Sequence, residues 1–262
     1  MKGARSPWTA AHTGILLVGI LFFEYASSGV WKGLPVTPGL SAINRAFPGA
    51  VAWAVGPLDG GGQDALLEIA CLAWTGLQRM VELGMILVAA RTWRHAGLRY
   101  SPGGLSARAL LYGFGTALTF GLAVCLVEAL SRTWGASLYR DVLLGSKGAD
   151  PVYATRGVQL AFWAVGILFG PAVEELFFRG VLLDTLMAAA SPFAAILVSA
   201  AIFACFHYLV SGGIPLVQFL GGLAFAWLTL RTGGLGAAWI LHASANAFVL
   251  LLEIHYQGSP LR

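Results

Sequence analysis

Two adjacent glutamates and an arginine stand out in an otherwise apolar segment of this chain. Glu174, Glu175 and Arg179 lie in the run Pro171-Ala-Val-Glu-Glu-Leu-Phe-Phe-Arg-Gly180. On a helix, Glu175 and Arg179 are at i and i+4, where their side chains can form a charge-assisted pair, whereas Glu174 points about 100° away. We therefore expect Glu175 and Arg179 to support the helix, and Glu174, which has no such cation on its own helix, to be the reactive carboxylate.

Two histidines and an asparagine follow in later apolar segments. His207 ends the run Phe203-Ala-Cys-Phe-His, and His242 and Asn246 are at i and i+4, on one face of a helix. Imidazoles can move protons, and imidazole and carboxamide groups can donate hydrogen bonds to a developing oxyanion. The set predicts hydrolysis of a peptide bond by water. Glu174, assisted by His207, would take the proton of that water, and His242 and Asn246 would stabilise the oxyanion.

The same residue types allow a second chemistry. Glu174, His207 and His242 could instead hold a zinc ion whose bound water attacks the carbonyl. The sequence has no HExxH motif, but ligands on different helices have no characteristic spacing. Both chemistries therefore remain open, with no cofactor favoured and zinc as the alternative.

The composition indicates that these residues are positioned by membrane helices. Hydrophobic residues make up 58% of the chain and charged residues 11%, and the mean hydropathy is +0.76. A soluble domain of this length needs more polar surface, so we expect the bilayer to be the solvent. The net charge of +4 is expected in cytoplasmic loops, and no basic patch interleaved with aromatic residues indicates a nucleic-acid partner.

The apolar runs predict an all-α, polytopic membrane bundle. A span needs about 20 mostly apolar residues. Seven stretches qualify, at 10–27, 65–90, 107–131, 158–188, 193–210, 214–231 and 235–254. An eighth apolar patch at 47–56 is too short to span and would be interfacial or re-entrant, so the helix count is seven or eight. We expect one continuous membrane domain, in which residues 1–157 are scaffold helices and residues 158–254 form the catalytic core.

Other polar residues in the early spans have simpler interpretations. Arg79 and Glu82 are at i and i+3 and should pair, either to stabilise the bundle or to form a wall of a substrate cavity. Glu24 lies near the end of a span and is expected to reach the membrane interface. The cysteines lie in apolar runs without metal-ligand spacing, so we expect residues such as Cys125 and Cys205 to be small buried hydrophobes.

One feature conflicts with a simple helical bundle. His207 is near the end of the fifth predicted span, and His242 is near the start of the seventh. Straight helices would leave these imidazoles at different depths in the membrane. The site therefore requires helices that shift, tilt or break.

The polar motifs resemble a known family. Pro171-x-x-Glu-Glu-x-x-Phe-Arg-Gly180, Phe203-x-x-x-His207 and His242-x-x-x-Asn246 are similar, in order, to the three-motif signature of the CPBP family, also called Abi, which includes the CAAX prenyl endopeptidases of the Ras-converting type. The resemblance covers about residues 158–250. It implies an intramembrane endopeptidase with Glu174 and His207 as the catalytic pair and the third motif at the oxyanion, although many relatives are labelled metalloproteases.

The resemblance leaves several substrates open. Eukaryotic members of the family cut the last three residues from prenylated CAAX proteins, and similar bacterial proteins are linked to bacteriocin immunity, peptide maturation or C-terminal sorting tails. We expect a membrane-embedded or lipid-modified protein or peptide as partner, and the short loops favour a bacterial cytoplasmic membrane. The alternatives from other classes are a non-catalytic scaffold or immunity protein, and a proton-coupled transporter, whose usual repeated half-sequences are not seen here.

Overall fold

The computed structural model describes residues 10–33, 61–92, 106–133, 160–161, 163–211 and 215–257. These residues are almost entirely helical and contain no β-strand, which confirms the all-α prediction. The elements are α1 (Ala10–Gly33), α4 (Gly61–Thr92), α5 (Ala107–Thr133), η3 (Val165–Phe169), α7 (Gly170–Glu175), η4 (Leu176–Leu182), α8 (Leu183–Ala189), α9 (Pro192–Ser211), α10 (Pro215–Thr232) and α11 (Gly236–Gln257). Because η3, α7, η4 and α8 follow one another directly, they form one helical rod. Each of the seven predicted spans coincides with a helical stretch, and the apolar patch at 47–56 lies outside the described residues.

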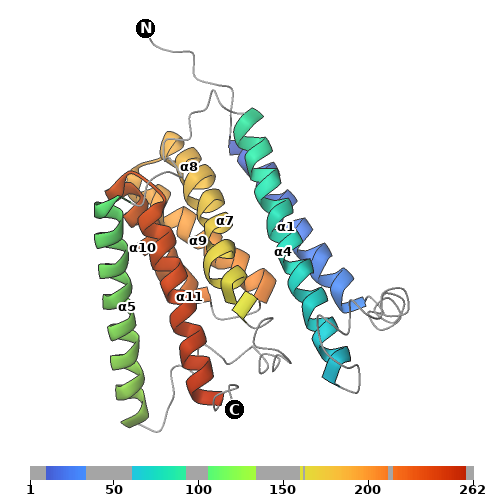
Figure 1. Cartoon of the computed structure of the whole chain (residues 1–262). Helices are drawn as coiled ribbons and strands as arrows, with labels where there is room; N and C mark the ends of the chain where they lie inside the picture. The colour runs from blue at the N-terminus through green and yellow to red at the C-terminus, as the bar shows by residue number, and fades with distance from the viewer. Residues whose placement is uncertain are drawn as a thin grey trace.

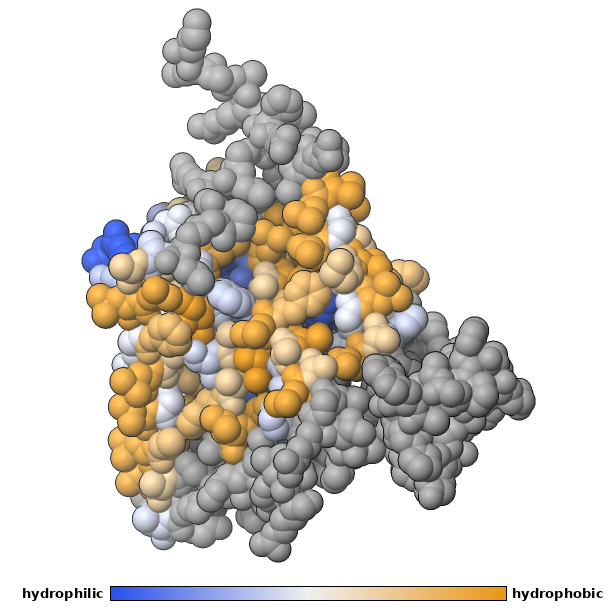
Figure 2. Space-filling model, in the orientation of Figure 1, coloured by the Kyte–Doolittle hydropathy of each residue, from blue (hydrophilic) through white to orange (hydrophobic). Residues whose placement is uncertain are grey.

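The outer surfaces of the helices are apolar. Windows long and apolar enough to cross a membrane occur in α4, α5 and α9, at Leu72–Ala89, Ala107–Val127 and Pro192–Leu209. Large apolar side chains point outward, and the most exposed, at 71% to 73%, are Ile15, Phe22, Leu111 and Phe193. Figure 2 shows such side chains covering much of one face of the bundle. Such a surface suits hydrocarbon rather than water, so the chain is an integral membrane protein.

The prediction that the cysteines are buried was wrong for two of them. Cys125 on α5 and Cys205 on α9 are both exposed. A thiol is only weakly polar, so it can face hydrocarbon at little cost. In a membrane protein, an apolar run therefore does not tell whether its small residues face protein or lipid.

The rod from η3 to α8 occupies the centre of the bundle. In Figure 1, α7 lies between the α1–α4 pair on one side and α10 and α11 on the other. Every residue in 177–183 is buried. Because neighbouring helices shield this rod from lipid, it can carry the charged residues that a lipid-facing helix could not.

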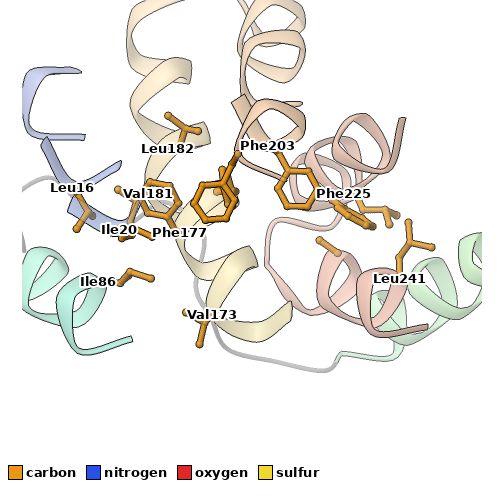
Figure 3. Packing of buried hydrophobic residues seen from close by; sticks show 14 of the residues in the cluster. Leu16, Ile20, Ile86, Val173, Phe177, Val181, Leu182, Phe203, Phe225 and Leu241 are labelled. Atoms are coloured by element: carbon orange, nitrogen blue, oxygen red, sulfur yellow. The ribbon is translucent and has the colours of Figure 1, made fainter. Parts of the chain in front are cut away.

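Aromatic and aliphatic side chains pack around this rod on two sides. Figure 3 shows Phe177 facing Leu16 and Ile20 of α1, while Phe203 of α9 and Phe225 of α10 lie on the other side. Leu16, at 9%, is the most exposed of these five residues, which form one buried cluster. The core therefore joins the N-terminal helices to the C-terminal ones through the central rod.

Glycines allow two pairs of helices to approach closely. A Cβ added at Gly222 of α10 would lie 3.0 Å from the Cα of Ala200 on α9, and one added at Gly113 of α5 would lie 2.8 Å from the Cβ of Ile240 on α11. Small residues at such contacts let helix backbones pack tightly in a membrane. These contacts place α9 and α11, which carry the candidate histidines, against their neighbours.

Candidate active site

Glu174, His207 and His242 come together at one point in the bundle. Glu174 Oε2 lies 3.5 Å from His207 Nε2 and 3.8 Å from His242 Nε2. The three side chains come from α7, α9 and α11 and are 14%, 24% and 6% exposed. The ring of Phe203 packs against both imidazoles, with its centroid 4.3 Å from that of His207 and 5.8 Å from that of His242. The expected difference in depth is therefore absent, because the packed helices bring both imidazoles to one carboxylate oxygen.

Hydrogen bonds on the far side of each imidazole orient the two rings. His207 Nδ1 is 3.0 Å from the carbonyl oxygen of Phe203, and His242 Nδ1 is 2.8 Å from Glu175 Oε1. A carbonyl and a carboxylate only accept hydrogen bonds, so both Nδ1 atoms carry the hydrogen. Both Nε2 atoms are thus turned toward Glu174. Its Oε2 is buried and has the two Nε2 atoms 3.5 Å and 3.8 Å away, so a proton held there could pass between these groups.

Glu175 and Arg179 form the predicted ion pair, and both side chains are buried. Arg179 Nη1 donates to Glu175 Oε1 at 3.1 Å, and the two side chains are 0% and 1% exposed. Arg179 Nη2 also lies 3.4 Å from the carbonyl oxygen of Gly222 on α10. Its Cζ is 4.4 Å from the ring centroid of Phe203 and 5.0 Å from that of Phe225. The arginine thus binds α7 and η4 to α9 and α10.

Glu175 has a second role that the sequence did not indicate. Its Oε1 accepts hydrogen bonds from both Arg179 and His242, so the carboxylate orients the imidazole as well as the arginine. Spacing along the chain could not reveal this contact, because Glu175 and His242 are 67 positions apart. The stacked ring of Phe225, 4.7 Å from His242, completes the support of this imidazole.

Arg79, from outside the predicted catalytic core, also lies beside Glu174. Its Nη1 lies 2.6 Å from Glu82 Oε2, which confirms the predicted pair, and 2.8 Å from Glu24 Oε1. Its Nη2 lies 4.0 Å from Glu174 Oε1. Glu174 therefore has a cation beside it, supplied by α4 rather than by its own helix.

The expectation that Glu24 reaches the membrane interface was wrong. This residue is 4% exposed, because the packing of α1 on α4 encloses it. Gln78 of α4 also donates a hydrogen bond to its Oε2. A carboxylate enclosed between two packed helices can stay buried only with such partners.

Asn246 contacts the backbone of the central rod. In η3 the N–H of Gly170 bonds to the carbonyl of Val165, five residues back. In this π-helical register the next carbonyl, that of Gly166, would be matched by the N–H of residue 171, but Pro171 has none. Asn246 Nδ2 donates to this carbonyl at 3.0 Å. The amide therefore replaces the donor that proline lacks.

The structure thus directs Asn246 to η3 rather than to Glu174. Trp239, two turns earlier on α11, acts in the same way, since its Nε1 donates to the carbonyl of Leu168 at 2.9 Å. Together these side chains hold the π-helical turn that precedes Glu174. A carboxamide has two N–H donors, so the second one of Asn246 remains for another acceptor.

The geometry does not form a metal site within the residues that the structure describes. Glu174, His207 and His242 are donor types that zinc takes. However, no group of three or more His, Cys, Asp or Glu side chains in the described ranges has an arrangement that could hold a metal ion.

Comparison with known proteins identifies the C-terminal part of the chain. Residues 156–248 match the sequence model of the type II CAAX prenyl endopeptidase Rce1-like family. No curated protein and no solved structure matches the chain. The matched range includes Glu174, His207, His242 and Asn246, whereas α1, α4 and α5 lie outside it. Residues 156–248 are thus similar to a family of CAAX prenyl endopeptidases, and this similarity indicates that the chain is a protease.

Proposed function

We propose that the chain hydrolyses a peptide bond in a membrane-embedded or lipid-modified protein or peptide, with a water molecule as the nucleophile. The observation that carries this proposal is the approach of His207 Nε2 and His242 Nε2 to one oxygen of Glu174, at 3.5 Å and 3.8 Å. A buried carboxylate between two oriented imidazoles is suited to proton transfer at a carbonyl.

Glu174 and His207 activate the water in this proposal. A water molecule about 2.8 Å from Glu174 Oε2 would also lie within reach of the imidazole nitrogens. Glu174, assisted by His207, takes a proton from the water as the water oxygen bonds to the carbonyl carbon. When the carbon–nitrogen bond breaks, the same proton passes to the leaving nitrogen.

His242 and Asn246 stabilise the oxyanion in this proposal. Glu175 holds Nδ1 of His242, and the imidazolium donates its Nε2–H to the negative oxygen. Asn246 contributes the amide hydrogen that Gly166 does not use. Glu175 and Arg179 act as supporting residues, because they hold His242 and the helices around it.

The apolar surroundings favour a substrate that reaches the site from the bilayer. The outer faces of the bundle carry large apolar side chains such as Leu118 and Leu209, 66% and 64% exposed. A CAAX-type C-terminus, a C-terminal sorting tail or a bacteriocin-type peptide would each supply an apolar or lipid-bearing segment beside the bond to be cut. We infer a bacterial cytoplasmic membrane as its location, because the loops of the sequence are short.

Cleavage by the purified protein tests this proposal. The wild type, Glu174→Ala and His207→Ala would each be incubated in detergent with a pool of membrane peptides that includes prenylated ones. His12→Ala is the matched control, because His12 is an exposed histidine of α1 outside the site. We expect cleavage by the wild type and the control, and none by the two site variants.

A chelator in the same assay separates the two chemistries. Cleavage that resists the chelator supports the glutamate-based mechanism. Loss of cleavage on chelation and its return with zinc would show that the metal alternative is right. An absence of cleavage across the whole pool, or cleavage that survives both site substitutions, would instead favour a scaffold, immunity or transport role.

A further inference from the structure

Arg79 connects the two N-terminal helices to the helix that carries Glu174. Its Nη1 binds Glu24 of α1 at 2.8 Å and Glu82 of α4 at 2.6 Å, and its Nη2 lies 4.0 Å from Glu174 Oε1 on α7. Its Nε is also close to the central rod, because a Cβ added at Gly170 would lie 3.9 Å from that nitrogen. One guanidinium on α4 therefore reaches both α1 and α7.

The two glutamates fix the direction in which the guanidinium points. Glu24 and Glu82 are 4% and 2% exposed, so neither moves freely in solvent, and Gln78 holds the second oxygen of Glu24. A guanidinium is planar and its donors form a rigid fork. Once Nη1 is bound to both glutamates, Nη2 is turned toward Oε1 of Glu174. This arrangement leaves Oε2 of Glu174 facing the two imidazoles.

The charges around Glu174 show why this cation matters. His207 faces it from α9 and His242 from α11, but an imidazole is charged only when protonated. Arg179 is already bound to the neighbouring Glu175 at 3.1 Å. Among these groups Arg79, which is 19% exposed, brings permanent positive charge to Glu174 itself.

We propose that Arg79 is a positioning residue for Glu174, and that α1 and α4 complete the active site by holding it there. The proposal rests on the proposed function of Glu174. It extends the site beyond residues 156–248, the range that the family shares, to helices that were expected to be scaffold. In this arrangement Arg79 orients the carboxylate through Oε1 and offsets its negative charge in the apolar bundle.

Substitutions of Arg79 test the proposal in the full-length protein. We expect Arg79→Met to lower kcat by about 100-fold with little change in KM, because the carboxylate is misplaced but substrate contacts remain. Arg231→Met is the matched control, because Arg231 is an exposed arginine at the end of α10 that lies over Tyr112.

Arg79→Lys separates charge from geometry. A lysine keeps the positive charge but lacks the rigid fork that holds the carboxylate in place, so we expect kcat of Arg79→Lys to fall as well, with little change in KM. This variant also keeps the test decisive if Arg79→Met does not yield folded protein, which size-exclusion chromatography would show. A wild-type kcat in Arg79→Lys, or an unchanged kcat in Arg79→Met, would overturn the proposal.

The Glu174→Ala variant keeps the two proposals distinct. If that variant is inactive and the Arg79 variants behave as the wild type does, Arg79 is not a positioning residue and the proposed function stands. If Glu174→Ala cleaves normally, the proposed function itself fails.

Discussion

Replacing Glu175 with glutamine should damage the fold, because it leaves a buried arginine without its counter-charge. The substitution keeps the size of the side chain and removes its charge. Arg179 is 0% exposed and donates to Glu175 at 3.1 Å, and losing one partner of such a pair costs about 3–5 kcal/mol of folding free energy. The rings of Phe203 and Phe225, 4.4 Å and 5.0 Å from the arginine Cζ, still stabilise the cation. We therefore expect a loss near the lower limit, about 3 kcal/mol.

The same substitution should also slow cleavage. In the wild type, His242 Nδ1 donates a hydrogen bond to the carboxylate of Glu175 at 2.8 Å. A glutamine carries no charge, so it holds the imidazole less firmly and weakens the Nε2 donor that faces the oxyanion. Loss of one oxyanion donor typically lowers kcat by about 10² to 10³-fold. We expect kcat of Glu175→Gln to fall within this range.

Two measurements on one preparation check both parts of this prediction. Reversible unfolding in mixed micelles, followed by circular dichroism, gives the free energy of unfolding, and peptide cleavage gives kcat. The control is the double variant Glu175→Gln with Arg179→Met, which removes both charges and should recover part of the lost stability but no activity. The reasoning is refuted if the free energy of unfolding of the single variant lies within about 1 kcal/mol of the wild-type value, because an exposed ion pair contributes that much. It is also refuted if the double variant is less stable than the single variant.

Further substitutions probe the helix contacts around the site. Gly222→Ala should lower the free energy of unfolding by about 1–3 kcal/mol, because the new Cβ would lie 3.0 Å from the Cα of Ala200. Gly115→Ala, where nothing lies within 4 Å, is the control, and equal unfolding midpoints for the two variants would contradict the close packing of α9 and α10. Asn246→Ala should cost about 1–3 kcal/mol by leaving the carbonyl of Gly166 without its donor, and Asn246→Asp should cost more, since a carboxylate would face that carbonyl. If unfolding shows aspartate to be tolerated better than alanine, the contact to η3 is not made.

Much of the fold follows from the sequence because the bilayer sets a simple rule. A stretch of about 20 apolar residues crosses the hydrocarbon as a helix, whatever its neighbours are. The predicted span at 193–210 and the observed α9 at Pro192–Ser211 differ by one residue at each end for this reason. Charged residues in such stretches are costly, so Glu174, Glu175 and Arg179 are conspicuous from their positions along the chain alone.

The sequence was less informative where a contact joins distant segments. The pairs Arg179 with Glu175, and Arg79 with Glu82, are one turn apart on single helices, so spacing predicts them. Arg79 and Glu174 are on different helices, and no period along the chain relates them. The prediction that Glu24 reaches the membrane interface was wrong because the burial of Glu24 depends on how α1 packs against α4.

The sequence by itself determined the chemical types at the site, the membrane setting and the helical stretches that carry them. These properties depend on the cost of placing each residue in hydrocarbon, which is a property of the residue and its near neighbours. Only the tertiary structure decided that His242 is held by Glu175, that Asn246 supplies the hydrogen bond missing at Pro171, and that Arg79 faces Glu174. Those contacts depend on how helices rotate and approach one another, and that is set by packing across the whole bundle rather than by spacing along the chain.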